Sequence, residues 1–150
     1  MKLQKATMFA LYAVLELAAD PARQPTAVEI ADKYGISSHH LAKVLRDLGR
    51  AGIVESARGV GGGYRFIGNP KRLTLMDVID LFEPAGDRRG RDGEAETPAA
   101  SALGLVLDEV DQHTEAIFRS IALSTLIKLM RQRPEAALYG HGSVTAQGHS

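Results

Sequence analysis

The sequence predicts a mostly helical chain that carries one short β-hairpin and ends in a long helix. Three observations support this fold class. Apolar residues recur at three- and four-residue spacings through residues 4–48, as on one face of an α-helix. Residues 53–68 instead hold two β-favouring segments with four glycines between them. The helical pattern then returns over residues 101–133, which is longer than the core of a small domain needs.

The first two predicted helices are amphipathic. Residues 4–19 place apolar side chains at helical spacings, and an Asp-Pro pair ends that segment. Thr26 and, three residues later, Glu29 form the pattern of a capping box, which opens a short second helix. Gly35 ends this helix. Its inner face is expected to consist of Val28, Ile30 and Ala31.

A third helix follows directly, with Ser37 as its N-cap and Gly52 just past its end. One face carries the apolar stripe Leu41, Val44, Leu45 and Leu48. The polar side chains that lie largely off this stripe are His39, His40, Lys43, Asp47 and Arg50. Two helices joined by a tight turn at Gly35 describe a helix-turn-helix.

The segment GVGGG at residues 59–63 allows three interpretations. A phosphate-binding loop is disfavoured because Tyr64 replaces the last glycine and no helix follows. A linker is disfavoured because the glycines lie between two β-patterned segments. The third interpretation is a hairpin tip, where glycines accept positive φ values and let the main chain approach phosphates. A helix-turn-helix followed by such a hairpin is a winged helix, here with Arg58 and Arg65 beside the tip.

A fourth helix closes the N-terminal domain. Thr74 and Asp77 form a second capping box at the start of TLMDVIDLFE, which has a helical apolar stripe. The winged helix-turn-helix domain is therefore expected to span residues 1–83. Residues 84–100 are rich in glycine, proline and charge and, alanine apart, have nothing to bury, so we expect a flexible loop.

The last predicted element is a single helix over residues 101–133, which would extend about 50 Å. A long helix with an apolar stripe most often packs against a copy of itself. We therefore expect a dimerisation helix; a helix folded back on its own domain is the alternative. Residues 134–150 are expected to form a disordered tail.

Composition limits the class of protein. The chain has 150 residues, about one domain, with no long apolar run and no signal-peptide pattern, so we expect a cytoplasmic protein without a membrane partner. It has no cysteine, which excludes thiolate metal sites. Residues 1–72 hold eleven Lys and Arg against six Asp and Glu, a net +5; residues 73–150 hold seven against twelve, a net −5. The basic front favours an anionic partner; random scatter of surface charge is the alternative.

The stretch GISSHHLAKVLRDLGRAGIVESARGVGGGYRF, followed by LTLMDVIDLFE, resembles the Rrf-type winged-helix transcriptional regulators, the group that includes IscR, NsrR and CymR. The resemblance covers roughly residues 1–133 in order and spacing. It implies a sequence-specific DNA-binding regulator that acts as a repressor. It also implies a homodimer with crossing long helices, whose two recognition helices and two wings meet a pseudo-palindromic operator in double-stranded DNA.

The resemblance also implies the DNA-binding residues. At the start of the recognition helix and one turn on, these are Ser37, Ser38, His39, His40 and Lys43, and on the wing Arg58. The hairpin interpretation adds the wing residues Gly59, Gly61, Tyr64 and Arg65. Serine and lysine side chains can bond bases or phosphates. For His39 and His40 a solvated helix end is the alternative. Tyr64 is expected to pack under the wing, with its hydroxyl toward a phosphate as the alternative. Arg46 and Arg50 are expected to be either surface pairs or phosphate contacts.

Many relatives hold an iron–sulfur cluster through three cysteines in the loop before the long helix. Here that loop has residues near Arg89, Ala95 and Ser101 at the corresponding places, and His113 is the nearest imidazole. Thiolates are the usual ligands of such clusters, so we expect no cofactor and no metal, with His113 at the dimer interface. The controlling signal stays open between a regulatory protein, a small-molecule effector and the concentration of the regulator itself.

Two other function classes compete with DNA binding. A winged-helix module that has lost DNA binding and recruits protein is the main alternative; the basic front half, Lys43 and the Arg58/Arg65 wing argue against it. An enzyme is not expected, because the sequence has no Ser/His/Asp arrangement, no HExxH motif and no phosphate loop.

Overall fold

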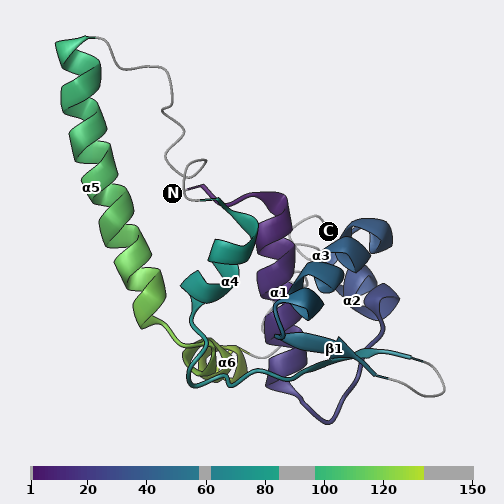
Figure 1. Cartoon of the computed structure of the whole chain (residues 1–150). Helices are drawn as coiled ribbons and strands as arrows, with labels where there is room; N and C mark the ends of the chain where they lie inside the picture. Colours follow the sequence, from purple (N-terminus) through teal and green to yellow (C-terminus); the bar gives the residue numbers. More distant parts are fainter. Residues whose placement is uncertain (1, 58–61, 85–96, 134–150) are drawn as a thin grey trace, which may run out of the picture.

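The computed structural model describes residues 2–57, 62–84 and 97–133. It confirms the predicted fold class, a mostly helical winged helix-turn-helix with a two-stranded antiparallel hairpin (Figure 1). In chain order the elements are α1 (Lys5–Ala19), α2 (Ala27–Tyr34), α3 (Ser38–Arg50), β1 (Val54–Ser56), β2 (Tyr64–Phe66), α4 (Leu75–Phe82), α5 (Pro98–Ser120) and α6 (Leu123–Arg131). Within the described ranges no helix has the length and apolarity that a membrane crossing requires. The expected loop at 85–96 and tail at 134–150 lie outside them.

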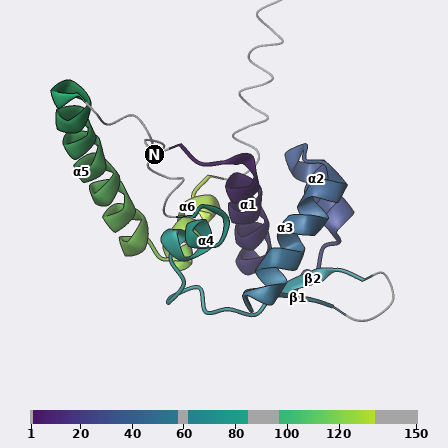
Figure 2. The same cartoon turned by 45° about the horizontal axis from the view of Figure 1, so that its top comes forward.

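Helix α1 is the centre of the core. It packs against α3 and α4, which lie on opposite sides of it, and also against β2 and α6 (Figures 1 and 2). Every helix except α5 contributes large, fully buried side chains: Leu17, Ile30, Leu41, Leu45, Leu48, Met76, Ile79 and Leu123. Burial of each such side chain contributes about 1.5–3 kcal/mol, so the apolar stripe of α3 is held firmly and its opposite face is left to solvent.

Local sequence signals set most of the helix ends. Gly35, directly after α2, and Gly52, which follows the C-cap Ala51 of α3, adopt the left-handed conformation with φ of 64° and 76°. Thr74 and Asp77 form a complete capping box at the start of α4. At α2, however, only half of the predicted box forms: Thr26 Oγ1 accepts from the N–H of Glu29 at 3.1 Å. The expectation that Val28 faces inward is wrong, since this residue is 56% exposed.

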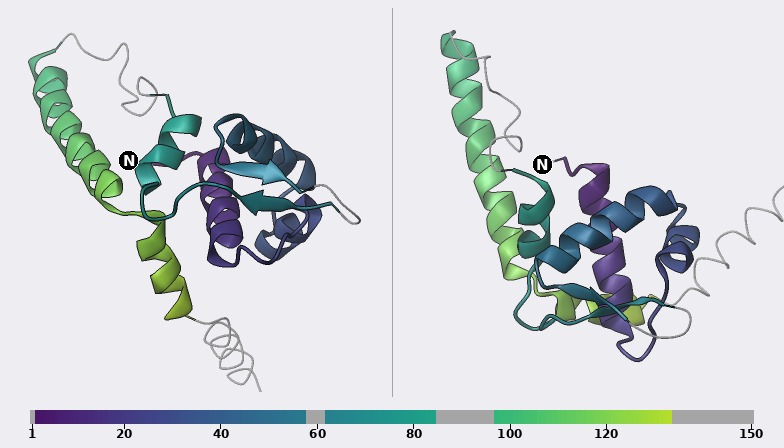
Figure 3. Two further views of the ribbon diagram at one scale, coloured as in Figure 1. Left: turned by 60° about the horizontal axis from the view of Figure 1, so that its bottom comes forward. Right: turned by 45° about the vertical axis from the view of Figure 1, so that its right-hand side comes forward.

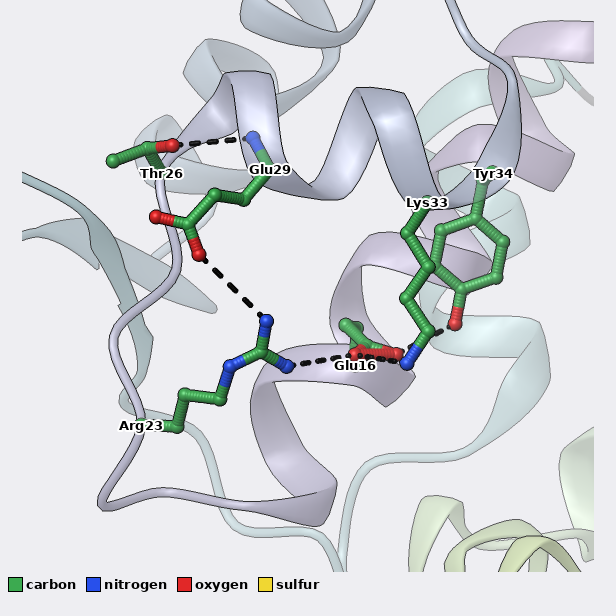
Figure 4. A network of polar contacts seen from close by, with 6 residues as sticks. All are labelled: Glu16, Arg23, Thr26, Glu29, Lys33 and Tyr34. Atoms are coloured by element: carbon green, nitrogen blue, oxygen red, sulfur yellow. Dashed lines mark hydrogen bonds and ion pairs between the residues drawn. The ribbon is translucent and has the colours of Figure 1, made fainter. Parts of the chain in front are cut away.

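Glu29 does not complete its box because its carboxylate lies 3.7 Å from Arg23, in a network that joins α1 to α2 (Figure 4). Glu16 is the hub of that network, with a side chain only 8% exposed. It accepts hydrogen bonds from the hydroxyl of Tyr34 at 2.7 Å, from Lys33 at 3.1 Å and from Arg23 at 3.4 Å. Charge-assisted bonds of this kind are stronger than neutral ones, so the network fixes the position of α2 on α1.

The single helix expected over residues 101–133 is two helices. Ile121 has extended backbone angles, and the chain there pairs with the segment before α4: the N–H of Leu75 donates to Ile121 O at 3.0 Å, and that of Leu123 donates to Leu73 O at 2.8 Å. These tertiary hydrogen bonds replace the intrahelical ones. As a result α6 folds back onto α1 with Leu123 and Ile127 buried, as in the alternative considered for this segment, whereas α5 projects from the domain (Figure 3).

Candidate nucleic-acid interface

The exposed face of α3 is polar and positively charged. Its four apolar residues are buried against the core, and the residues turned to solvent are Ser38, His39, Lys43, Arg46 and Arg50. Arg50 lies 4.0 Å from Asp47, whereas Lys43 and Arg46 make no ion pair within the described part of the chain. Two cations without a neutralising partner on one helix face are suited to an anionic surface, and Arg46 is the better placed of the two arginines that sequence reasoning left open.

The N-terminus of α3 is capped by Ser37, whose Oγ accepts from the N–H of His40 at 3.4 Å. The cap occupies an acceptor of the hydroxyl but leaves its proton free to donate. The first turn of a helix also carries a partial positive charge. Ser37, Ser38 and His39 are all exposed at this turn, so the structure brings them together at a point that favours an anion.

His40 differs from His39, a distinction that the sequence did not reveal. Its ring is half-buried and meets the ring of Phe9 edge-on, with centroids 4.9 Å apart and planes at 78°. Edge-to-face geometry is one of the favoured arrangements of aromatic pairs. His40 is therefore part of the contact between α1 and α3, whereas His39 is open to solvent.

The wing is a short hairpin in which Glu55 pairs with Arg65 and Ser56 with Tyr64. The guanidinium of Arg65 donates to the carboxylate of Glu55 and forms an ion pair with it. The charge of Arg65 is therefore partly neutralised within the wing, by a residue that sequence reasoning did not consider. The candidate residues Arg58, Gly59 and Gly61 lie outside the described residues.

The base of the wing rests on the loop between α1 and α2. The N–H of Tyr64 donates to Pro25 O at 2.9 Å, and the side chain of Tyr64 is half-buried against the core. Gly63 has a φ of 122°, and a Cβ at this position would clash with the carbonyl oxygen of Gln24. Glycine is thus required here both by conformation and by close approach. Gly63 is a second residue that sequence reasoning did not single out, although its place in GGGY was a visible signal.

Residues 3–129 match the sequence profile of the Rrf2 family, described as "Iron-dependent Transcriptional regulator". The chain belongs to the Rrf2 family. It is 52% identical over 130 residues to the "Putative HTH-type transcriptional regulator BadM" of Rhodopseudomonas palustris, covering 87% of this chain and 83% of that protein. It is 32% identical over 137 residues to "Protein aau3" of Rhizobium meliloti, covering 90% and 88%.

Solved structures show the same fold. IscR of T. potens superposes with a TM-score of 0.70 at 23% identity and covers 89% of this chain and 92% of that one. CymR, the global cysteine regulator of B. subtilis, superposes with a TM-score of 0.69 at 26% identity and covers 87% and 98%. This Rrf2 chain is therefore a winged-helix, DNA-binding transcriptional regulator, as the resemblance in its sequence implied.

The side chains of this Rrf2 protein do not fit an iron–sulfur cluster, although the family description refers to iron. The chain has no cysteine to supply thiolates. In the described ranges no three His, Asp or Glu side chains come together as a metal site would need. His113 is exposed on α5, and its Nε2 lies 3.7 Å from Glu109.

Proposed function

We propose that the chain is a homodimeric repressor that occupies promoter DNA and works without an iron–sulfur cluster. The observation that carries the proposal is the exposed face of α3, which begins at the capped first turn and holds Lys43 and Arg46, two cations without an ion-pair partner among the described residues. A regulator of this kind acts in the cytoplasm, where the DNA is. It does not act as an enzyme. The chain supplies no thiolates for a cluster.

In this proposal the first turn of α3 enters the major groove. Ser38 and His39 bond base edges or phosphates, and Lys43 reaches guanine or a phosphate one turn further along. Ser37 holds the helix start and donates its remaining proton, while Arg46 binds the phosphate backbone. His40 contributes mainly by fixing α3 on α1, in keeping with its contact to Phe9.

The wing is proposed to reach the flanking minor groove. Arg58 supplies the charge, because a narrow minor groove attracts arginine. Gly59 and Gly61 let the main chain approach the phosphates. Tyr64 and Arg65 support the wing from its base, since the first packs on the core and the second is paired with Glu55.

The dimer is proposed to form through α5. None of its 23 residues is buried, and six of its large apolar side chains are 44–72% exposed, whereas Phe118 near its end packs against the core. Five residues at alternating four- and three-residue spacings make a continuous seam, here named the α5 stripe: Leu103, Leu107, Val110, Thr114 and Ile117. An apolar stripe of this extent marks an interaction site. A second copy carries the same stripe and can cover it symmetrically.

The proposal is tested with a duplex selected by the chain from a random-sequence library. Affinity for that duplex should fall steeply with salt, because each phosphate contact releases counterions. Light scattering should give the mass of a dimer, and the selected sequence should contain two inverted half-sites. A winged-helix module that recruits protein instead would select no duplex, or would bind DNA with little salt dependence.

A further inference from the structure

Helix α1 begins without a side-chain cap of its own. Gln4 occupies the N-cap position, and its side chain makes no capping hydrogen bond. Its backbone N–H instead donates to Oε1 of Glu83 at 2.8 Å, a residue 79 positions away that directly follows α4. A carboxylate at this place also meets the positive end of the α1 dipole. Glu83, the residue that follows α4, therefore caps α1.

The carboxylate that makes this cap is closed to solvent, although Gln4 itself is exposed. Glu83 is 3% exposed and Thr7, in the first turn of α1, is fully buried. Neither Oε2 of Glu83 nor Oγ1 of Thr7 has a hydrogen-bond partner among the described residues. Thr7 stands three residues after the N-cap, where a capping box usually has a carboxylate or amide that reaches back to the N-cap N–H. Glu83 supplies from α4 the carboxylate that the sequence of α1 lacks.

The same helix also holds the recognition helix. Phe9 lies five residues after Gln4, and its ring meets that of His40 edge-on. The backbone N–H of His40 in turn donates to Ser37, the cap of α3. Because α1 lies between α4 and α3 (Figures 1 and 2), a continuous set of contacts leads from Glu83 through the first turns of α1 to the N-terminus of α3.

We propose that Glu83 is a positioning residue for DNA binding: its carboxylate fixes the first turn of α1, and α1 fixes the base-reading end of α3. This inference rests on the proposed function, in which that end of α3 contacts the operator. A buried carboxylate with one unpartnered oxygen is an unfavourable way to stabilise a fold, whereas a charged hydrogen bond to a helix end restricts its orientation strongly.

The test uses Glu83→Met, which removes the acceptor and the unpartnered oxygen while keeping the length of the side chain. The matched control is Asp80→Asn, since Asp80 is in α4, three residues before Glu83, but lies 3.4 Å from Arg119 of α5. Affinities are measured for the duplex selected by the unaltered chain and for a scrambled duplex. Glu83→Met should weaken binding to the selected duplex about threefold to thirtyfold and leave binding to the scrambled duplex unchanged; Asp80→Asn should change neither.

A second variant separates positioning from loss of folded protein. Gln4→Pro removes the N–H donor but leaves the side chains of Glu83 and Thr7 in place, and the φ of −69° at Gln4 already suits proline. It should reproduce the loss of affinity for the selected duplex that is seen with Glu83→Met. The double variant should lose no more affinity than either single variant. In a chain that already carries Phe9→Leu, Glu83→Met should cause no further loss of affinity for the selected duplex, because the ring contact with His40 is then absent.

The inference would be overturned if Glu83→Met bound the selected duplex with unchanged affinity. It would also be overturned if the losses of affinity from Glu83→Met and Gln4→Pro were additive in the double variant. Circular dichroism at the assay temperature verifies that each variant is folded. If the unaltered chain selects no duplex, the proposed function itself fails, and that result is distinct from a failure of Glu83.

Discussion

Helix α1 and helix α5 are both amphipathic, but they differ in how far their apolar faces are buried. In its 15 residues α1 buries seven: Thr7, Ala10, Leu11, Ala13, Val14, Leu17 and Ala18. In its 23 residues α5 buries none. The two helices show that apolar periodicity predicts a helix but does not identify the surface that covers it. The cover of α1 lies within the chain, whereas in the proposed dimer the cover of α5 comes from a second copy.

The largest expected effect breaks the proposed cover of α5. Val110→Asp puts a charge in the middle of the α5 stripe, so we expect a monomer that loses operator affinity by at least about a hundredfold, because two linked half-sites bind far more tightly than one. Light scattering and a binding titration measure both changes. Leu105→Asp is the matched control, since Leu105 is 72% exposed but lies about 200° around the helix from Leu103. Equal losses in both variants would count against the stripe.

The second prediction concerns the buried apolar face of α1. Leu17 is fully buried in α1, so Leu17→Ala should lower the free energy of unfolding by about 2–5 kcal/mol. Leu105→Ala should change it by less than about 0.5 kcal/mol. Urea denaturation at one fixed protein concentration measures both, because the stability of a dimer depends on concentration. A large loss from Leu105→Ala would mean that the two faces of α5 are both covered.

The features that the sequence predicted correctly are those with local causes. Gly35, Gly52 and the Thr74–Asp77 box each act within a few residues, so their patterns predict helix ends directly. The break of the long helix at Ile121 has a distant cause, because it depends on hydrogen bonds to Leu73 and Leu75. The helical spacing of apolar residues continues across such a break, so the sequence pattern does not predict it.

The candidate site shows the same division. The stripe of α3 predicted correctly which face is buried, and so which side chains are left to solvent. The sequence could not distinguish His40 from His39, because only the packing of Phe9 does so. Nor could it pair Arg65 with Glu55 or Glu83 with Gln4, since each contact depends on how separate elements meet.

The third prediction concerns the tip of the wing. Arg58→Ala should weaken binding to the selected duplex by about 1–3 kcal/mol without unfolding the protein. The variant should remain a dimer, unlike Val110→Asp, because the wing and α5 are separate parts of the molecule. Fluorescence anisotropy measures the affinity, and light scattering checks the mass. If operator affinity were unchanged, the hairpin would not take part in binding.

The smallest expected effect comes from the other arginine of the wing. The guanidinium of Arg65 is already paired with Glu55 across the hairpin, and exposed pairs of this kind contribute little. Arg65→Ala should therefore weaken binding to the selected duplex by less than about threefold, with a salt dependence like that of the unaltered chain. Glu55→Gln provides the converse variant: it frees the guanidinium, so affinity should rise slightly and its salt dependence should steepen. If Arg65→Ala lost as much affinity as Arg58→Ala, the guanidinium would have to leave Glu55 and bind DNA itself, and the wing would contact the duplex along its strand as well as at its tip.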